Sequence, residues 1–187
     1  MSSSGVVGGG GGGSPYELRG AGSPQGVVAA PVGFYYTDEA GTNGAVRWAS
    51  FEGIGTTGWR CIAGDTGRRQ LDALLVNGWT VDMHIYVRRI NDQVEWRFEG
   101  INGAARTHNV GGAAEDFLAH INGFRPAIQP SGQGNGFGIP LNTGSLVLLN
   151  HHQSGYWRAD GPVYNAWDSV RLLTADDWPA ALPGVAG

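Results

Sequence analysis

The sequence predicts an all-β protein with an N-terminal glycine-rich extended arm, a small β-meander and a C-terminal antiparallel β-sandwich. Glycine accounts for 33 of the 187 residues, against roughly 13 at average usage. Apart from one N-terminal run, these glycines stand where short strands would turn. Between them lie short runs rich in aromatic and β-branched residues, which favour strands. The only candidate helix, residues 113–120, is short and poorly patterned.

Residues 1–31 are expected to form the extended arm. Residues 2–4 are serines and residues 8–13 are glycines, so this segment has few side chains to pack and would lose much backbone entropy if ordered. Pro24 and Pro31 interrupt regular structure further. We therefore expect a leader that is mobile in the free protein and becomes fixed when partner subunits hold it.

Residues 32–70 are expected to form a small β-rich module of about three short strands. The runs 32–38, 45–48 and 58–62 are rich in aromatic or β-branched residues, and Gly, Asn, Thr or Asp bounds each run. Such a meander is too thin to bury its own aromatic side chains. We expect it to lean on neighbouring copies or on the domain that follows.

Residues 71–187 are predicted to form the β-sandwich domain, and its clearest element is a hairpin around the Asn91-Asp92 turn. The expected apolar rows of this hairpin are Met83, Ile85 and Val87, and Val94, Trp96 and Phe98. A slip of one residue in register would expose the second row to water, so the alternation specifies the pairing. Trp79 is expected to cap one end of this core. Further strands are expected at residues 146–150, 156–158 and 169–174.

Composition and charge argue against several classes of partner. Hydrophobic residues make up 41% of the chain, which is enough for a core and argues against global disorder. The net charge is −4 and no basic cluster is present, so nucleic acid is not an expected partner. The chain has no apolar run long enough to cross a bilayer and no signal-peptide start, so membrane insertion is not expected.

No metal or cofactor site is expected from the spacing of the ligand-type residues. His151 and His152 are adjacent, so on a strand their rings would point to opposite faces. The other histidines have no ligand partners at helical or finger spacing. Cys61 is the single cysteine, which excludes an intramolecular disulfide and favours a small buried hydrophobe. The glycine run lacks a preceding strand, and the chain has no Lys to reach a phosphate.

A catalytic function is not expected either. A glycoside hydrolase needs two carboxylates that face each other across a cleft. Glu95, Arg97 and Glu99 instead alternate along one predicted strand, where a solvated Glu–Arg–Glu row accounts for them. The chain contains no Gly-x-Ser-x-Gly elbow, and its cysteine lacks the sequence context of a protease nucleophile.

Two groups of short motifs resemble a known protein family. The first group is Tyr36-Thr37-Asp38, Thr42-Asn43-Gly44-Ala45, Trp48, Thr57-Gly58-Trp59-Arg60 and Gly64-Asp65-Thr66-Gly67. The second group is Leu75-Val76-Asn77-Gly78-Trp79-Thr80, the hairpin, and Gly123-Phe124-Arg125-Pro126. In this order they resemble minor tail proteins and tail-fibre tips of long-tailed (siphovirus-type) phages of actinobacteria. Many members of that family are longer and carry shafts or collagen-like repeats, so this chain resembles a small accessory subunit.

The resemblance implies a structural virion component of a phage tail, which is synthesised in the host cytoplasm and is not an enzyme. In that family the N-terminal part attaches to the tail tip or fibre shaft, which implies that residues 32–70 are an attachment module. The C-terminal β-domain of the family is exposed and often trimeric. The implied partners are two further copies in a homotrimer, other phage tail proteins and a host cell-surface glycan.

Two other functions remain open from the residues alone. A glycan-binding module would stack sugar rings on exposed aromatic side chains. The candidate contacts are Tyr156, Trp157, Arg158, Tyr164 and Trp167. Packing in a core or at a subunit interface is the favoured role for these residues, because aromatic residues and Arg are frequent in both. The other alternative is a capsid decoration protein whose glycine leader lies along the shell.

Overall fold

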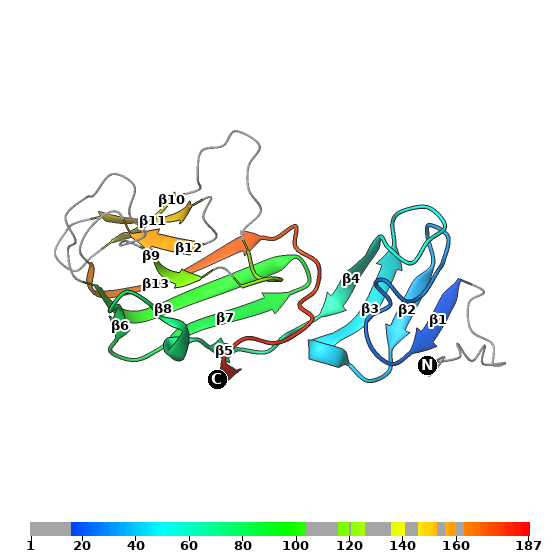
Figure 1. Cartoon of the computed structure of the whole chain (residues 1–187), viewed down its shortest axis with the longest axis horizontal. Coiled ribbons are helices and arrows are strands. Elements are labelled where there is room, and N and C mark those ends of the chain that lie inside the picture. Colours follow the sequence, from blue (N-terminus) through cyan, green and yellow to red (C-terminus); the bar gives the residue numbers. More distant parts are fainter. Residues whose placement is uncertain are drawn as a thin grey trace.

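The computed structural model describes residues 16–103, 116–119, 121–125, 136–140, 146–152, 156–159 and 163–187. Within these ranges the chain forms fourteen strands and two single-turn 3-10 helices, η1 (Thr42–Gly44) and η2 (Asp72–Leu74). The predicted all-β class is confirmed. The strands form three sheets. One sheet occupies one end of an elongated molecule, and the other two lie one above the other at the opposite end (Figure 1).

The first sheet has the strand order β1-β2-β3-β4. Its strands are β1 (Glu17–Gly20), β2 (Tyr35–Asp38), β3 (Ala45–Ser50) and β4 (Trp59–Gly64). Strands β2, β3 and β4 form the predicted antiparallel meander, and β1 is added parallel to β2. The meander packs around a core that also includes residues from outside it, Val28 and Ala30 from the preceding segment and Trp178 from the C-terminal part. The full set is Val28, Ala30, Tyr36, Ala45, Trp48, Trp59 and Trp178.

Residues 16–31 contain strand β1 of this first sheet and pack against its core, so the prediction of an extended leader was wrong for this segment. Strand β1 pairs with β2, and Val28 and Ala30 are buried in the core. The indole N–H of Trp59 donates to the carbonyl oxygen of Val28 at 2.7 Å. Burial of these side chains and pairing of the backbone offset the entropy that argued for a tether. The rest of the predicted leader, residues 1–15, lies outside the described residues.

The second sheet has the order β13-β8-β7-β5-β14, with β6 paired to β8. Its strands are β5 (Arg69–Gln70), β6 (Thr80–Val81), β7 (Ile85–Ile90), β8 (Gln93–Gly103), β13 (Val163–Leu173) and β14 (Val185–Ala186). The chain passes from the first sheet to the second between β4 and β5. Residues 69–70, which were expected in the N-terminal module, therefore pair within the C-terminal sheet.

The predicted hairpin β7–β8 is confirmed in its register and in most of its core. Val87 pairs with Trp96, and Asn91 in the turn has a left-handed φ of 55°, which Asn tolerates well. The core around the hairpin contains Leu71, Trp79, Ile85, Val87, Val94, Trp96, Phe98, Ile101, Leu118 and Phe124. Trp79 lies flat against the backbone of Gly103, where an added Cβ would approach the indole ring to 2.4 Å.

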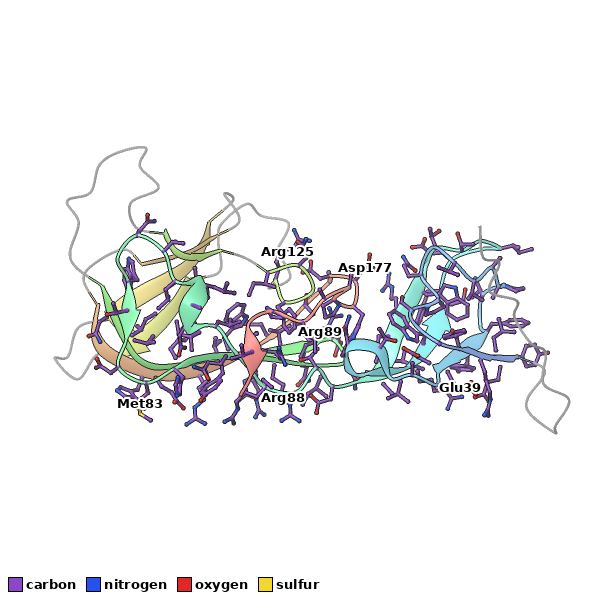
Figure 2. The ribbon with its side chains drawn as sticks, turned by 60° about the horizontal axis from the view of Figure 1, so that its bottom comes forward. Glu39, Met83, Arg88, Arg89, Arg125 and Asp177 are labelled. Carbon is purple, nitrogen blue, oxygen red and sulfur yellow. The ribbon has the colours of Figure 1, made fainter. Side chains whose placement is uncertain are left out.

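Met83 is an exception to the predicted apolar row. Strand β7 begins only at Ile85, so the strict alternation does not extend back to Met83. Its side chain is 51% exposed and lies below the ribbon in Figure 2. The prediction that Met83 belongs to the core was therefore wrong.

The third sheet has the order β10-β11-β12-β9. Its strands are β9 (Asp116–Ala119), β10 (Gly136–Pro140), β11 (Leu146–His152) and β12 (Tyr156–Ala159). The expected strands at 146–150 and 156–158 are confirmed. Residues 116–119 are a strand paired with β12 and not part of a helix, because pairing within the sheet overrides a weak local helix preference.

Candidate functional site

The first sheet exposes the face that is opposite its core. Along β3, Trp48 is buried while its neighbour Arg47 is exposed, because successive side chains of a strand point to opposite faces. Tyr35 of β2 and Arg60 of β4 both pair with Ala49 of β3. These three residues form one row across the exposed face, and Arg47 lies next to that row.

Two arginines of this face lie over aromatic rings. The Cζ atom of Arg47 is 4.8 Å from the ring centroid of Tyr35, and that of Arg60 is 5.4 Å from the ring centroid of Phe51. Both rings are exposed. Such contacts stabilise by about 0.5–1 kcal/mol at exposed sites and restrict where the guanidinium group lies. We call Tyr35, Arg47, Ala49, Phe51 and Arg60 the arginine–aromatic face.

Neither Arg47 nor Arg60 forms an ion pair or side-chain hydrogen bond with a described residue. The paired arginines are Arg19 with Glu17, Arg88 with Asp65, Arg97 with Glu99, Arg125 with Asp176 and Arg171 with Glu95, while Arg69 and Arg89 donate to carbonyl groups. Arg68 resembles Arg47 and Arg60 in lying over an aromatic ring, since its Cζ atom is 5.0 Å from the ring centroid of Tyr86. Among the described residues, the two guanidinium groups of the arginine–aromatic face therefore have no acidic side chain within ion-pair distance.

The second sheet exposes a polar face that is already internally paired. Tyr86, Arg97 and Ser169 form one row across β7, β8 and β13. Arg97 pairs with Glu99, whose side chain is only 8% exposed. The prediction of a solvated Glu–Arg–Glu row was therefore wrong for Glu99, whose side chain is buried next to Arg97.

Asp72 anchors η2 to the edge of this polar face. Its carboxylate accepts hydrogen bonds from the backbone N–H of Ile85 at 2.8 Å and from the side-chain amide of Gln70 at 2.7 Å, and it lies 2.7 Å from Nδ1 of His84. Burial opposes ionisation of Asp72, but these hydrogen bonds outweigh it and lower the pKa of the carboxyl group. No cluster of three or more His, Cys, Asp or Glu side chains suitable for a metal occurs in the described part of the chain.

The predicted glycan contacts fall on two different sheets. Tyr156, Trp157 and Arg158 lie on β12 of the third sheet, whereas Tyr164 and Trp167 lie on β13 of the second sheet. Trp167 pairs with Glu99 across the polar face and its side chain is 44% exposed. The side chains of the other four residues lie outside the described part of the structure.

Arg89 connects the second sheet to two segments that are distant in the sequence. Its guanidinium group donates to the carbonyl oxygens of Asn91 at 2.7 Å, Gly123 at 2.7 Å, Asp177 at 2.8 Å and Asp176 at 3.0 Å. Its side chain lies on the opposite side of the sheet from Arg88, towards Asp177 (Figure 2). Burial lowers the pKa of Arg89, since burial opposes its charge.

Trp178 carries this connection into the core of the first sheet. Its ring lies 4.9 Å from Cζ of Arg89, and its indole N–H donates to the carbonyl oxygen of Asn43 at 3.1 Å. The side-chain amide of Asn43 in turn donates to the carbonyl oxygens of Pro179 and Ala180. An added Cβ at Gly64 would lie 2.7 Å from the Trp178 ring, so glycine is needed at this contact. We call the contacts of Asn43, Gly64, Arg89, Asp176 and Trp178 the junction.

Acid is expected to weaken the junction through Asp176. Burial opposes ionisation of this carboxyl group, but hydrogen bonds from Arg125 and the Gly123 amide outweigh it, so the pKa is lowered. A pKa below the unfolded value of about 3.9 adds stability above that pH, and this stability is lost as the pH falls through the folded pKa. The melting temperature should therefore drop below about pH 4, with a smaller drop in Asp176→Asn than in the wild type. Equal pH dependence of the two proteins would contradict this role of Asp176.

Comparison of the chain with family models, curated proteins and solved structures gives no match. No helix in the described ranges is long and apolar enough to cross a membrane. The arginine–aromatic face and the junction are the two features of the described residues that bear on function. Neither feature was predicted from the sequence, although Arg47 and Arg60 each stand next to a buried tryptophan.

Proposed function

We propose that the protein is a structural subunit of a phage tail, which attaches through the arginine–aromatic face and holds its C-terminal β-domain outward. The observation that carries this proposal is a pair of arginines that lie over exposed aromatic rings on one sheet face and have no ion-pair partner among the described residues. Tyr, Phe and Arg are enriched in protein interfaces, and Arg is prominent among the residues that contribute most to binding. The proposed role is one of assembly and attachment, without catalysis.

The junction supports the second part of this proposal. A subunit that attaches at one end and presents a surface at the other needs a fixed orientation between the two ends. Arg89 is almost fully buried and Trp178 belongs to the core of the first sheet. Buried side chains that are held by several hydrogen bonds restrict motion between the parts they join. The first and second sheets would therefore move as one body in the assembly.

Several residues of the motifs that resemble the phage family stand at turns where the backbone has a positive φ. The turn residues among them with positive φ are Asn43, Gly44, Gly58, Gly67, Asn77, Gly78, Asn91 and Gly123. Asn43 and Gly64 also form part of the junction. Glycine and asparagine adopt such angles at little cost. The resemblance therefore covers residues that determine the backbone path, which supports a shared scaffold.

The proposal extends to a β-sandwich in the C-terminal domain and to a homotrimer. Leu118 of the third sheet is buried in the core of the second sheet and bridges to Leu75, which supports the packing of one sheet on the other.

Large apolar side chains are exposed on the N-terminal part, including Ile54 at 87%. Contact with further copies would cover them. The exposed Trp167 on the polar face favours a role in contacts with a host-surface glycan at the outward end.

Assembly into phage particles tests this function. Particles should carry the labelled protein at the tail, in a copy number divisible by three. Arg47→Glu combined with Arg60→Glu should reduce the copies per particle by about tenfold, because charge reversal makes the attachment repulsive. The matched control Arg171→Glu changes an exposed arginine of the polar face and should be incorporated normally. Quantitative mass spectrometry and imaging measure number and position. Label on the capsid would support a decoration protein instead, and absence from particles would overturn the proposal.

A further inference from the structure

We infer that the polar face of the second sheet binds a neutral hexopyranose ring. The indole of Trp167 stacks on the apolar side of the sugar, and the ion pair of Glu99 with Arg97 forms hydrogen bonds with two neighbouring hydroxyl groups. This inference rests on the proposed function, since it names the class of sugar and the residues that would contact it at the outward end.

The register of the sheet places Trp167, Glu99 and Arg97 on one face. Trp167 pairs with Glu99, and the register between β13 and β8 is unbroken from there to Leu173. Side chains of directly paired residues stand on the same face, with their Cβ atoms about 4.5–5.5 Å apart. Arg97 precedes Glu99 by two residues and shares this face. The face is the lower side of the sheet in Figure 2, where Arg88 lies.

Trp167 gives the polar face a flat apolar surface. Its side chain is exposed, and it lies on β13, the first strand in the order of this sheet. An indole ring offers a broad apolar face, which suits a ligand that is apolar on one side and polar at its rim. A hexopyranose ring has this shape, because its C–H groups gather on one side and its hydroxyl groups project from the edge.

The ion pair supplies an acceptor and donors at adjacent positions. The side chain of Glu99 is 8% exposed, and its contact with Arg97 is its one ion pair or side-chain hydrogen bond with a described residue. Nε of Arg97 lies 2.5 Å from Oε1 of Glu99. The second carboxylate oxygen and the two terminal nitrogens of the guanidinium group therefore remain for a ligand. One hydroxyl group can donate to the carboxylate while its neighbour accepts from the guanidinium group.

His84 adds a third polar group beside Glu99. The amide of Glu99 donates to the carbonyl oxygen of His84 at 2.9 Å. The imidazole lies on the polar face, since its ring is 5.4 Å from that of Tyr86, which pairs with Arg97. Nδ1 of His84 is 2.7 Å from the Asp72 carboxylate. This contact holds the ring in place and leaves Nε2 as the nitrogen for a ligand hydroxyl.

The charges on this face favour a neutral sugar over an acidic one. Three of its arginines each pair with a carboxylate. The pairs are Arg88 with Asp65, Arg97 with Glu99 and Arg171 with Glu95. An acidic sugar would bring a further carboxylate next to Glu99, and like charges at such a distance repel. A neutral sugar forms hydrogen bonds with the pair and leaves both charges matched.

Titration of the full chain with small sugars tests this inference. The probes are the methyl hexopyranosides of glucose, mannose and galactose, and the acidic control is methyl glucuronide. Ligand-observed saturation-transfer NMR should give a dissociation constant of about 1 mM for at least one neutral probe, as expected for a ligand of this size. Methyl glucuronide should bind about tenfold more weakly than that neutral probe, because of its charge.

Two variants locate the site. Trp167→Ala removes the stacking surface and Glu99→Gln removes the charged acceptor, so each should raise the dissociation constant about tenfold. The matched control Arg171→Gln changes an exposed arginine of the same face and should bind as the wild type does. Melting curves establish that the variants are folded, and Trp167→Ala decides the test if Glu99→Gln does not fold.

Three outcomes would overturn the inference. The first is no binding of any neutral probe at about 20 mM. The second is unchanged affinity in Trp167→Ala, and the third is tighter binding of methyl glucuronide than of the neutral probes. If particles carry the protein at the tail but no neutral sugar binds, the proposed attachment stands and this inference fails. If a neutral sugar binds as expected but particles lack the protein, the inference stands and the phage role fails.

Discussion

Trp96→Ala is expected to lower the free energy of unfolding by about 3–5 kcal/mol, as truncation of a fully buried aromatic side chain usually does. Trp96 has no exposed surface, pairs with Val87 and Val170 across two strands, and stacks on Phe98 at 6.4 Å between ring centroids. A domain is stable by only about 5–15 kcal/mol in total. Urea unfolding of the variant should show a large loss of stability or no cooperative transition.

The matched control for this experiment is Arg171→Ala. From the sequence alone Arg97 would be chosen as the control, since it follows Trp96 on the strand and is expected to point to the opposite, solvated face. However, Arg97 pairs with the nearly buried Glu99, so its removal would leave a carboxylate buried without its partner. The side chain of Arg171 is 72% exposed and pairs with Glu95 at 3.5 Å, so its loss should cost about 0–1 kcal/mol. Wild-type stability of Trp96→Ala would show that the core of the second sheet is assigned incorrectly.

The hairpin and the meander could be predicted because their signals are local. Alternation with a period of two residues identifies the buried side chains of a strand, and Asn91-Asp92 marks the turn between two such strands. The segment 16–31 was predicted incorrectly because its partners are remote in the sequence. Its glycines and prolines are compatible both with a flexible leader and with an ordered segment. The pairing of β1 with β2, which no local pattern indicates, makes the segment ordered.

The arginine–aromatic face could be predicted only in part. A residue next to a buried tryptophan on a strand must face outward, so Trp48 and Trp59 imply that Arg47 and Arg60 are exposed. The contacts with Tyr35 and Phe51 depend on the register between strands and the side-chain rotamers, which no local pattern specifies. The junction was missed for a similar reason, since Trp178 and Asn43 are 135 residues apart.

Arg89→Met is expected to destabilise the protein by about 3–5 kcal/mol and to loosen the junction. The substitution removes the donors to four carbonyl oxygens, those of Asn91, Gly123, Asp176 and Asp177. Each buried acceptor that loses its donor costs about 1–3 kcal/mol unless water replaces the donor. Arg89→Lys should restore little stability, because an ammonium group has three donors on one nitrogen and cannot span the fork that the guanidinium group fills.

Arg88→Met is the matched control, because Arg88 is the neighbouring residue but points to the opposite face. Its ion pair with Asp65 joins two half-exposed side chains, so its loss should cost about 0–1 kcal/mol. Thermal unfolding measures the stability of both variants, and small-angle X-ray scattering measures their maximum dimension. Arg89→Met should show a broader distribution of dimensions than Arg88→Met, since Trp178 would no longer be held between the two sheets. If both variants are equally stable and equally compact, Arg89 does not fix the junction, and the proposed rigid connection between attachment face and outward domain loses its main support.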